Sequence, residues 1–192
     1  MVETITNIYL VGVGGQGILL ASEILSEALM LAGHDVKKAE VHGMAQRGGS
    51  VVSHVRFGSR VYSPIIPEGE GDILFGFELL ETYRHLHFLR PDGRVIVNDL
   101  RILPPGVNLG LQEYPDAIAE RISEAFADTT IVDAASLATK AGSERAANTV
   151  LLGALSRRLE LDEAIWRQAI THMVPEKFRE LNLRAFELGR AC

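Results

Sequence analysis

Residues Ile8–Ala21 read IYLVGVGGQGILLA, and this stretch decides the fold of the chain. A run of β-branched and aromatic residues ends in a cluster of glycines, and a run with helical spacing of apolar residues follows at once. This order is typical of the strand–turn–helix unit that opens nucleotide-type α/β folds. Gly12, Gly14 and Gly17 have the spacing found in dinucleotide-binding enzymes, so the first interpretation is a dehydrogenase.

The glycine turn has two readings that the residues leave open. Free backbone N–H groups at the start of a helix form an anion site, for which the candidates are Gly12, Gly14, Gly15, Gln16 and Gly17. Alternatively, the glycines only allow a tight turn and close packing of helix on strand. Glu40, which lies 23 positions after Gly17, is placed where dinucleotide-binding folds carry their ribose-binding acid, although a solvated charge at a strand end gives the same pattern.

Composition limits the classes of protein that fit. The chain has 192 residues, of which 47% are apolar and 23% charged, as in a compact domain, and we expect a single domain over residues 1–192. The formal charge of −6 argues against nucleic-acid binding. The N-terminus lacks a basic region of the secretory type, and glycines interrupt the uncharged run at 4–22, so we expect a cytoplasmic protein with no membrane span.

Cysteine and histidine usage argues against a metal centre. The one cysteine is Cys192, so the chain can form no internal disulfide and no all-cysteine zinc or iron–sulfur site. His85 and His87 are two positions apart in an expected helix and face different sides of it. We therefore expect no metal on this chain, and no motif identifies a catalytic nucleophile.

The remaining pattern predicts an α/β fold. It is a Rossmann-like, mostly parallel mixed sheet with helices on both faces and a helical C-terminal third. After the opening strand, strands are expected over residues 35–41, 51–57, 60–63, 72–77, 94–98 and 129–133, with 51–57 and 60–63 forming a hairpin. A turn is expected at 91–93 and irregular structure at 101–110. Helices are expected over residues 18–31, 78–89, 115–126, 144–160, 162–171 and 175–190.

The stretch at 42–50 reads HGMAQRGGS and is predicted to be a loop, because three glycines in seven positions disfavour the helix of a second strand–helix–strand repeat. Loops at strand ends form the clefts of open α/β sheets. An arginine there can clamp a carboxylate or phosphate through two hydrogen bonds. We predict a functional surface that docks a partner or binds a small molecule, formed by His42, Met44, Gln46, Arg47, Gly48 and Gly49.

Five motifs taken together resemble one family. They are Val11–Gly17, His42–Val51, Val55–Phe57, Ser63–Pro64 and the Asn148-x-x-x-Leu152-Gly153-Ala154 pattern. The combination is similar to the gamma-type subunits of the 2-oxoacid:ferredoxin oxidoreductases, and its His-Gly-Met-Ala-Gln-Arg-Gly-Gly form resembles the indolepyruvate branch. The resemblance runs from about residue 7 to at least residue 170.

The resemblance implies a reaction of a complex rather than of this chain alone. Such enzymes oxidatively decarboxylate a 2-oxoacid with thiamine diphosphate, pass electrons through iron–sulfur clusters to ferredoxin and release an acyl-CoA. We expect none of these cofactors on this chain, because it has one cysteine and no Gly-Asp-Gly motif of the thiamine-diphosphate type. The expected partners are the cofactor-bearing subunit, docked through the 42–50 loop, and ferredoxin through the complex.

Within that complex, the glycine turn and Arg47 are candidates for contact with CoA or for control of substrate access. Two other functions stay open from the sequence. One is a free-standing NAD-dependent dehydrogenase that uses the glycine turn and Glu40, and the other is an assembly scaffold whose turn binds nothing. Isolated from its partners, the chain could also pair with a second copy as a homodimer.

Overall fold

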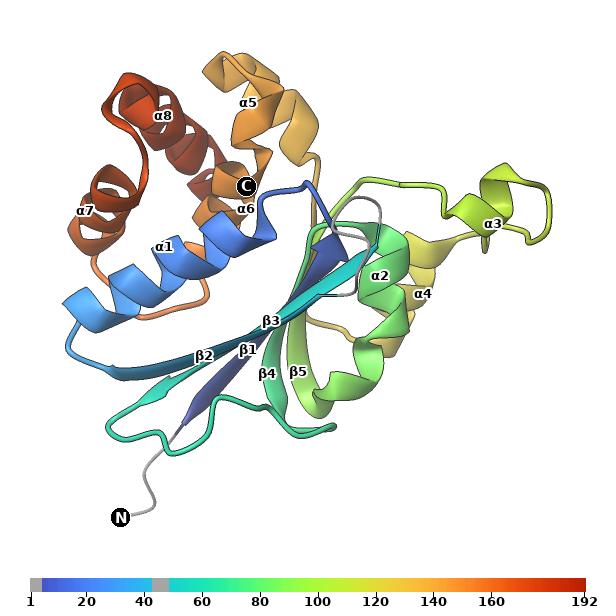
Figure 1. Cartoon of the computed structure of the whole chain (residues 1–192), viewed down its shortest axis with the longest axis horizontal. Helices are drawn as coiled ribbons and strands as arrows, with labels where there is room; N and C mark the ends of the chain where they lie inside the picture. The colour runs from blue at the N-terminus through green and yellow to red at the C-terminus, as the bar shows by residue number, and fades with distance from the viewer. Residues whose placement is uncertain (1–4, 43–48) are drawn as a thin grey trace.

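The computed structural model describes residues 5–42 and 49–192, which fold around one mixed sheet (Figure 1). In the described part of the chain the sheet has six strands in the order β2–β3–β1–β4–β5–β6. The pairs β1–β4, β4–β5 and β5–β6 are parallel, whereas β3 is antiparallel to both β1 and β2. The strands are β1 (Thr6–Val13), β2 (Asp35–His42), β3 (Ser50–Gly58), β4 (Gly71–Gly76), β5 (Leu89–Asn98) and β6 (Thr129–Val132).

Helices cover both faces of the sheet, as the sequence predicts. One face packs against α1 and the helices of the C-terminal third, and the other packs against α2 and α4 (Figure 1). The helices are α1 (Ile18–Leu31), α2 (Leu79–Arg84), α3 (Pro105–Asn108), α4 (Ile118–Ala125), α5 (Ala134–Ala141), α6 (Ala147–Ser156), α7 (Glu163–Met173) and α8 (Arg179–Arg190), with short 3-10 turns η1 (Leu86–Phe88), η2 (Glu144–Ala146) and η3 (Glu176–Phe178).

The central strand β1 supplies both cores by alternation of its side chains. Ile8 and Leu10 are buried in the core beneath α1 and α5–α8, and Tyr9 and Val11 are buried in the core beneath α2 and α4. Successive residues of a strand point to opposite faces, so a strand covered by helices on both sides is apolar throughout. This explains why the opening strand reads as a continuous apolar run.

The opening β1–α1–β2 unit differs from a simple strand–helix–strand repeat, because β3 lies between the two parallel strands. Since β2 and β3 are antiparallel neighbours, a short connection can join them, and no second crossover helix is needed. The prediction of a loop rather than a helix over 42–50 concerns residues that lie mostly outside the described part.

The predicted hairpin between residues 51–57 and 60–63 is wrong. β3 forms as expected, but Phe57 pairs with Thr6 of β1 on one side and with Val36 of β2 on the other, so both edges of β3 are already occupied. The backbone N–H of Val61 instead donates a hydrogen bond to the carboxylate of Asp35 at 2.7 Å. Residues 60–63 therefore form no strand.

Three further predicted segments differ from the structure. The predicted turn at 91–93 is an irregular part of β5, where Leu89 pairs with Gly71 and Arg94 pairs with Ile73, so β5 carries extra residues at this point. The helix predicted over 78–89 ends at Arg84 and continues as η1. The irregular segment predicted at 101–110 contains the single turn α3.

No helix in the described residues has both the length and the apolar character needed to cross a membrane.

Candidate functional site

The turn between β1 and α1 is shaped by two glycines in the left-handed region. Gly15 has φ +104° and Gly17 has φ +77°, values that L side chains rarely adopt. A Cβ at Gly17 would lie 2.7 Å from Asn148 Nδ2, whereas the space around Gly15 is open. Gly17 is the N-cap of α1 and provides no side-chain cap. The first turn of α1 thus keeps the uncapped N–H groups and the positive dipole end that favour anions.

Gln16 holds the turn against the sheet. Its Oε1 accepts a hydrogen bond from Val13 N at 2.7 Å, and its Nε2 donates one to the carbonyl oxygen of Phe77 at 2.7 Å. Gly12 lies beneath this bridge, since a Cβ there would be 2.7 Å from Gln16 Oε1 and from Phe77 Cβ. Both Gly12 and Gln16, candidate anion contacts from the sequence, have a clear structural role in joining β1 to β4.

Gly14 connects the turn to the far end of the 42–50 loop. Its N–H donates a hydrogen bond to the carbonyl oxygen of Gly49 at 2.9 Å, and Val13 pairs with Ser50. The structure therefore brings one end of the predicted docking loop beside the glycine turn. His42 ends β2 opposite Val51, and its side chain lies outside the described part. The predictions for Met44, Gln46, Arg47 and Gly48 concern residues outside the described ranges.

The parallel strands β1, β4, β5 and β6 end at one edge of the sheet, where open α/β folds form their clefts. Asn98, the last residue of β5, donates from Nδ2 to Phe77 O at 3.3 Å and accepts at Oδ1 from Ala134 N at 3.2 Å. Asp133 caps α5 by accepting from Ser136 N at 3.0 Å, and the hydrogen bonds from Ser136 lower its carboxyl pKa. These strand-end residues join elements of the fold.

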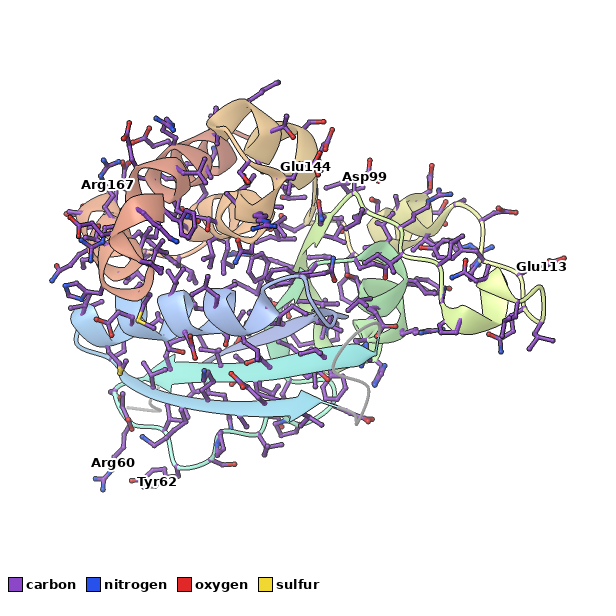
Figure 2. All side chains as sticks on the ribbon, turned by 45° about the horizontal axis from the view of Figure 1, so that its top comes forward. Arg60, Tyr62, Asp99, Glu113, Glu144 and Arg167 are labelled. Atoms are coloured by element: carbon purple, nitrogen blue, oxygen red, sulfur yellow. The ribbon has the colours of Figure 1, made fainter. Side chains whose placement is uncertain are left out.

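A cavity of about 460 Å³ opens at this edge beside the glycine turn. Its walls come from the turn, from the ends of β4 and β5, and from the segment that begins α6. Figure 2 shows Asp99 and Glu144 at the same side of the molecule. The residues of the lining include Gly15, Gly17, Asn98, Glu144, Arg145 and Asn148.

A second hollow of about 470 Å³ lies on the other side of the turn, where its lining includes Gly14, Gly15, Leu19 and Val51. Gly15 borders both spaces. Because Gly15 has no side chain and open space around its Cα, its backbone is accessible from either side.

The C-terminal part of the chain supplies cavity residues that the sequence pattern does not identify. Asn148 Nδ2 donates to Gly17 O at 3.3 Å, so this residue fixes the start of α1. Arg145 is exposed and makes no ion pair with the described residues. Asn148 belongs to the motif of the family resemblance, but Glu144 and Arg145 carry no local signal because they lie about 130 positions from the turn.

The position of Glu40 does not suit a dinucleotide site. In the dinucleotide-binding fold the acid follows a strand that neighbours the first one, but here β3 separates β2 from β1. The carboxylate of Glu40 pairs with Lys38 Nζ at 2.8 Å, and Ser22 Oγ donates to it at 3.4 Å. Glu40 is thus an ion-paired residue of an edge strand.

No histidine or cysteine of the described residues lines the two hollows beside the glycine turn. Residues 5–42 and 49–192 contain no group of three or more His, Cys, Asp or Glu side chains arranged to hold a metal. The ring of His85 lies near that of Tyr9, with centroids 5.7 Å apart, and the ring of His87 packs on Phe88 with centroids 4.7 Å apart. Cys192 is exposed at the end of the chain. The donor set needed for an iron–sulfur cluster is therefore lacking in these residues.

Comparison with known sequences places the chain in a family. The family model described as pyruvate ferredoxin/flavodoxin oxidoreductase matches residues 7–192. The indolepyruvate oxidoreductase subunit IorB of Thermococcus kodakarensis is 43% identical over 188 residues, which cover 95% of this chain and 93% of the relative. A longer relative, the ketoisovalerate oxidoreductase subunit VorA of Methanothermobacter thermautotrophicus, is 29% identical, and the alignment covers 95% of this chain and 35% of VorA.

Solved structures agree with the fold. The gamma subunit of a keto/oxoacid ferredoxin oxidoreductase from Geobacter sulfurreducens matches with a TM-score of 0.74 and 25% identity, covering 97% of this chain and 94% of that one. The 2-oxoglutarate:ferredoxin oxidoreductase of Magnetococcus marinus, solved with 2-oxoglutarate, coenzyme A and succinyl-CoA bound, matches with a TM-score of 0.76 and 22% identity, covering 97% of this chain and 30% of that one. With its glycine turn and inserted antiparallel strand, this chain belongs to the pyruvate ferredoxin/flavodoxin oxidoreductase family, among the gamma-type subunits.

Proposed function

We propose that this chain is the cofactor-free subunit of an indolepyruvate oxidoreductase complex, which oxidatively decarboxylates a 2-oxoacid and forms an acyl-CoA. The observation that carries the proposal is the 43% identity to IorB over nearly the full length of both chains. Residues 1–192 then act as one domain of a cytoplasmic enzyme. Its partner is the subunit that bears thiamine diphosphate and iron–sulfur clusters, and ferredoxin is reached through the complex.

The proposed distribution of cofactors between the two subunits follows from the side chains that this chain contains. Cluster binding requires several thiolates, and the sequence has one cysteine. Separating the two subunits and measuring iron, acid-labile sulfide and thiamine diphosphate tests this directly. We expect all three in the partner and none above background in this chain, and stoichiometric iron or thiamine diphosphate here would overturn the assignment.

We further propose that the glycine turn binds an anionic group of CoA or of the 2-oxoacid. Support comes from the uncapped start of α1, the open space at Gly15 and the exposed Arg145 on the cavity wall. N–H groups at a helix start and a guanidinium both stabilise phosphate and carboxylate oxygens. This chain would bind and orient the anion, and the redox chemistry would take place on the partner.

In this proposal the 42–50 loop is the segment on which the partner subunit docks. Its end at Gly49 is bonded to Gly14, so a partner seated on the loop would lie next to the turn. Arg47 is the cation that the sequence offers in this loop.

Two substitutions at Gly15 test the anion site with a matched control. Gly15→Asp and Gly15→Asn require the same left-handed backbone and have nearly the same size, but only the first adds a negative charge. In the assembled complex we expect the KM for CoA or for the 2-oxoacid to be at least about tenfold higher with Asp than with Asn. Equal kinetics of the two variants would favour a turn that binds nothing and serves only assembly.

A further inference from the structure

Between β5 and α4 the chain leaves the body of the molecule as a projecting arm, defined as residues 101–114 and containing α3. Figure 1 shows α3 standing clear of both helical layers, and Figure 2 shows Glu113 at the outer end of this projection. Three leucines of the arm are exposed, Leu103 at 47%, Leu109 at 72% and Leu111 at 76%. Leucines exposed to this extent on a projecting segment are available to form an interaction surface.

The base of the arm is anchored on one buried carboxylate. Glu78 Oε1 accepts a hydrogen bond from Ile102 N at 3.0 Å and another from the Tyr114 hydroxyl at 3.1 Å, so a single oxygen holds both ends of the arm. The guanidinium of Arg101 lies 5.7 Å from the centre of the Tyr114 ring. A fixed base positions the leucines before any partner binds, which lowers the entropy cost of binding.

The tip of the arm is also ordered by its own backbone. Leu109 N donates to Pro105 O at 3.0 Å, and Leu111 N donates to Gly106 O at 2.9 Å. Residues 102–112 contain no charged side chain, although 23% of the whole chain is charged. An uncharged, internally bonded tip that presents leucines outward suits an apolar groove on another protein.

We propose that this arm inserts into an apolar groove of the cofactor-bearing subunit, an inference that rests on the proposed function. The longer relative VorA supports this partner, because the matching segment is only 35% of its length. A surface that packs on the remaining length of such a chain would face a separate subunit here. The arm also begins one residue after Leu100, which lines the cavity beside the glycine turn, so the partner would border the same edge.

The test compares the arm with another exposed apolar site on the same protein. The arm variant carries Leu109→Asp and Leu111→Asp. The control carries Tyr62→Asp and Ile65→Asp in the segment after β3, at side chains exposed by 77% and 49%. All four side chains are exposed, so both variants are expected to fold, and circular dichroism and thermal melting verify this.

Affinity for the purified cofactor-bearing subunit is measured by calorimetry for the wild-type chain and both variants. We expect the arm variant to bind about 100-fold more weakly than the wild type. The two aspartates lose the apolar burial of the leucines, and removing their charges from water in an apolar groove costs free energy. The control should stay within about threefold of the wild type. Equal affinity of the arm variant and the wild type would overturn the proposal.

Two other outcomes of the experiment can be distinguished from these results. If the wild-type chain does not bind the subunit at all, the proposed function fails before the arm is tested. Sedimentation of the isolated chain tests the alternative that the arm binds a second copy of this chain. A dimer that the arm variant dissociates, together with unchanged affinity for the subunit, would assign the arm to self-association and overturn the proposal.

Discussion

Gln16 Nε2 donates a hydrogen bond to the carbonyl oxygen of Phe77 at 2.7 Å, which ties the glycine turn after β1 to the end of β4. The same side chain accepts from Val13 N through Oε1. One amide thus fixes the position of the turn relative to two neighbouring strands, so Gln16, at the fifth position of the Gly12–Gly17 motif, has a structural role.

Replacing Gln16 with alanine is expected to destabilise the fold. The change removes both hydrogen bonds and leaves the N–H of Val13 without its partner, at a cost of about 1–3 kcal/mol. Urea denaturation of the isolated chain measures the change in the free energy of unfolding. Gln168→Ala on the exposed face of α7 is the control and should change it by less than about 0.5 kcal/mol. An effect of Gln16→Ala no larger than that of the control would refute the structural role.

The two glycines where α6 crosses α8 are predicted to tolerate no side chain. A Cβ on Gly153 would collide with the carbonyl oxygen of Phe186, and one on Gly189 would collide with the carbonyl oxygen of Val150. Because backbone atoms cannot rotate away, Gly153→Ala and Gly189→Ala should each cost about 3 kcal/mol. Thermal melts compare them with Ala135→Ser, which also adds one heavy atom but at an exposed helical position. Melting temperatures close to that of this control would contradict the close crossing.

His54 is predicted to lower stability in acid. Burial and the nearby Arg56 lower its pKa, and its Nδ1 accepts a hydrogen bond from Ile66 N at 3.1 Å, which requires an unprotonated Nδ1. As pH falls below about 6.5, the unfolded chain takes up a proton that the folded chain resists, so the free energy of unfolding decreases. In His54→Asn an amide oxygen can replace the acceptor and does not titrate. The wild type should therefore lose more stability than the variant between pH 7 and 5, and parallel profiles would count against the prediction.

Tyr114 is predicted to contribute through its hydroxyl group. Burial, followed by the neighbouring Glu78 carboxylate, raises the pKa of Tyr114 to about 12, so the hydroxyl stays protonated and donates to Glu78. Tyr114→Phe should reduce the free energy of unfolding by about 1–3 kcal/mol at neutral pH. The wild type should also lose stability as pH rises from 10 towards 12, because the unfolded tyrosine ionises first, and this part of the loss should be smaller in the variant. Denaturant titrations at both pH values measure the two effects, and identical profiles would argue against the bond.

Much of the fold can be predicted from local sequence pattern. The features that this pattern does not predict depend on contacts between residues far apart in the chain. The apolar run at 8–13 and the glycines after it predict β1 and its turn, because each signal lies within a few residues. The pattern of β3 is the same whether Phe57 pairs with Thr6 or with a hairpin partner, so its place between β1 and β2 is not encoded locally. Turn-forming residues at 91–93 likewise predict a turn, although neighbouring β4 and β5 accommodate them inside a strand.

The candidate site shows the same division. Spacing identifies Gly12, Gly14 and Gly17, and Gly17 has a left-handed conformation. Gly15, the other left-handed glycine of the turn, lies outside that spacing. Arg145 comes to the cavity from far along the chain, so only the fold places it there. The exposed leucines of the arm resemble core residues in a sequence, because hydrophobicity alone does not distinguish exposed leucines from buried ones.

We propose that this chain contributes to a 2-oxoacid oxidoreductase only as part of a complex. The most direct measurement is 2-oxoacid-dependent and CoA-dependent reduction of a low-potential dye by the chain, by its cofactor-bearing subunit, and by the two reassembled. We predict that activity with indolepyruvate requires both chains and CoA, and that NAD neither binds to the isolated chain nor changes the rate. Full activity of the partner without this chain, or micromolar binding of NAD to this chain alone, would overturn this assignment.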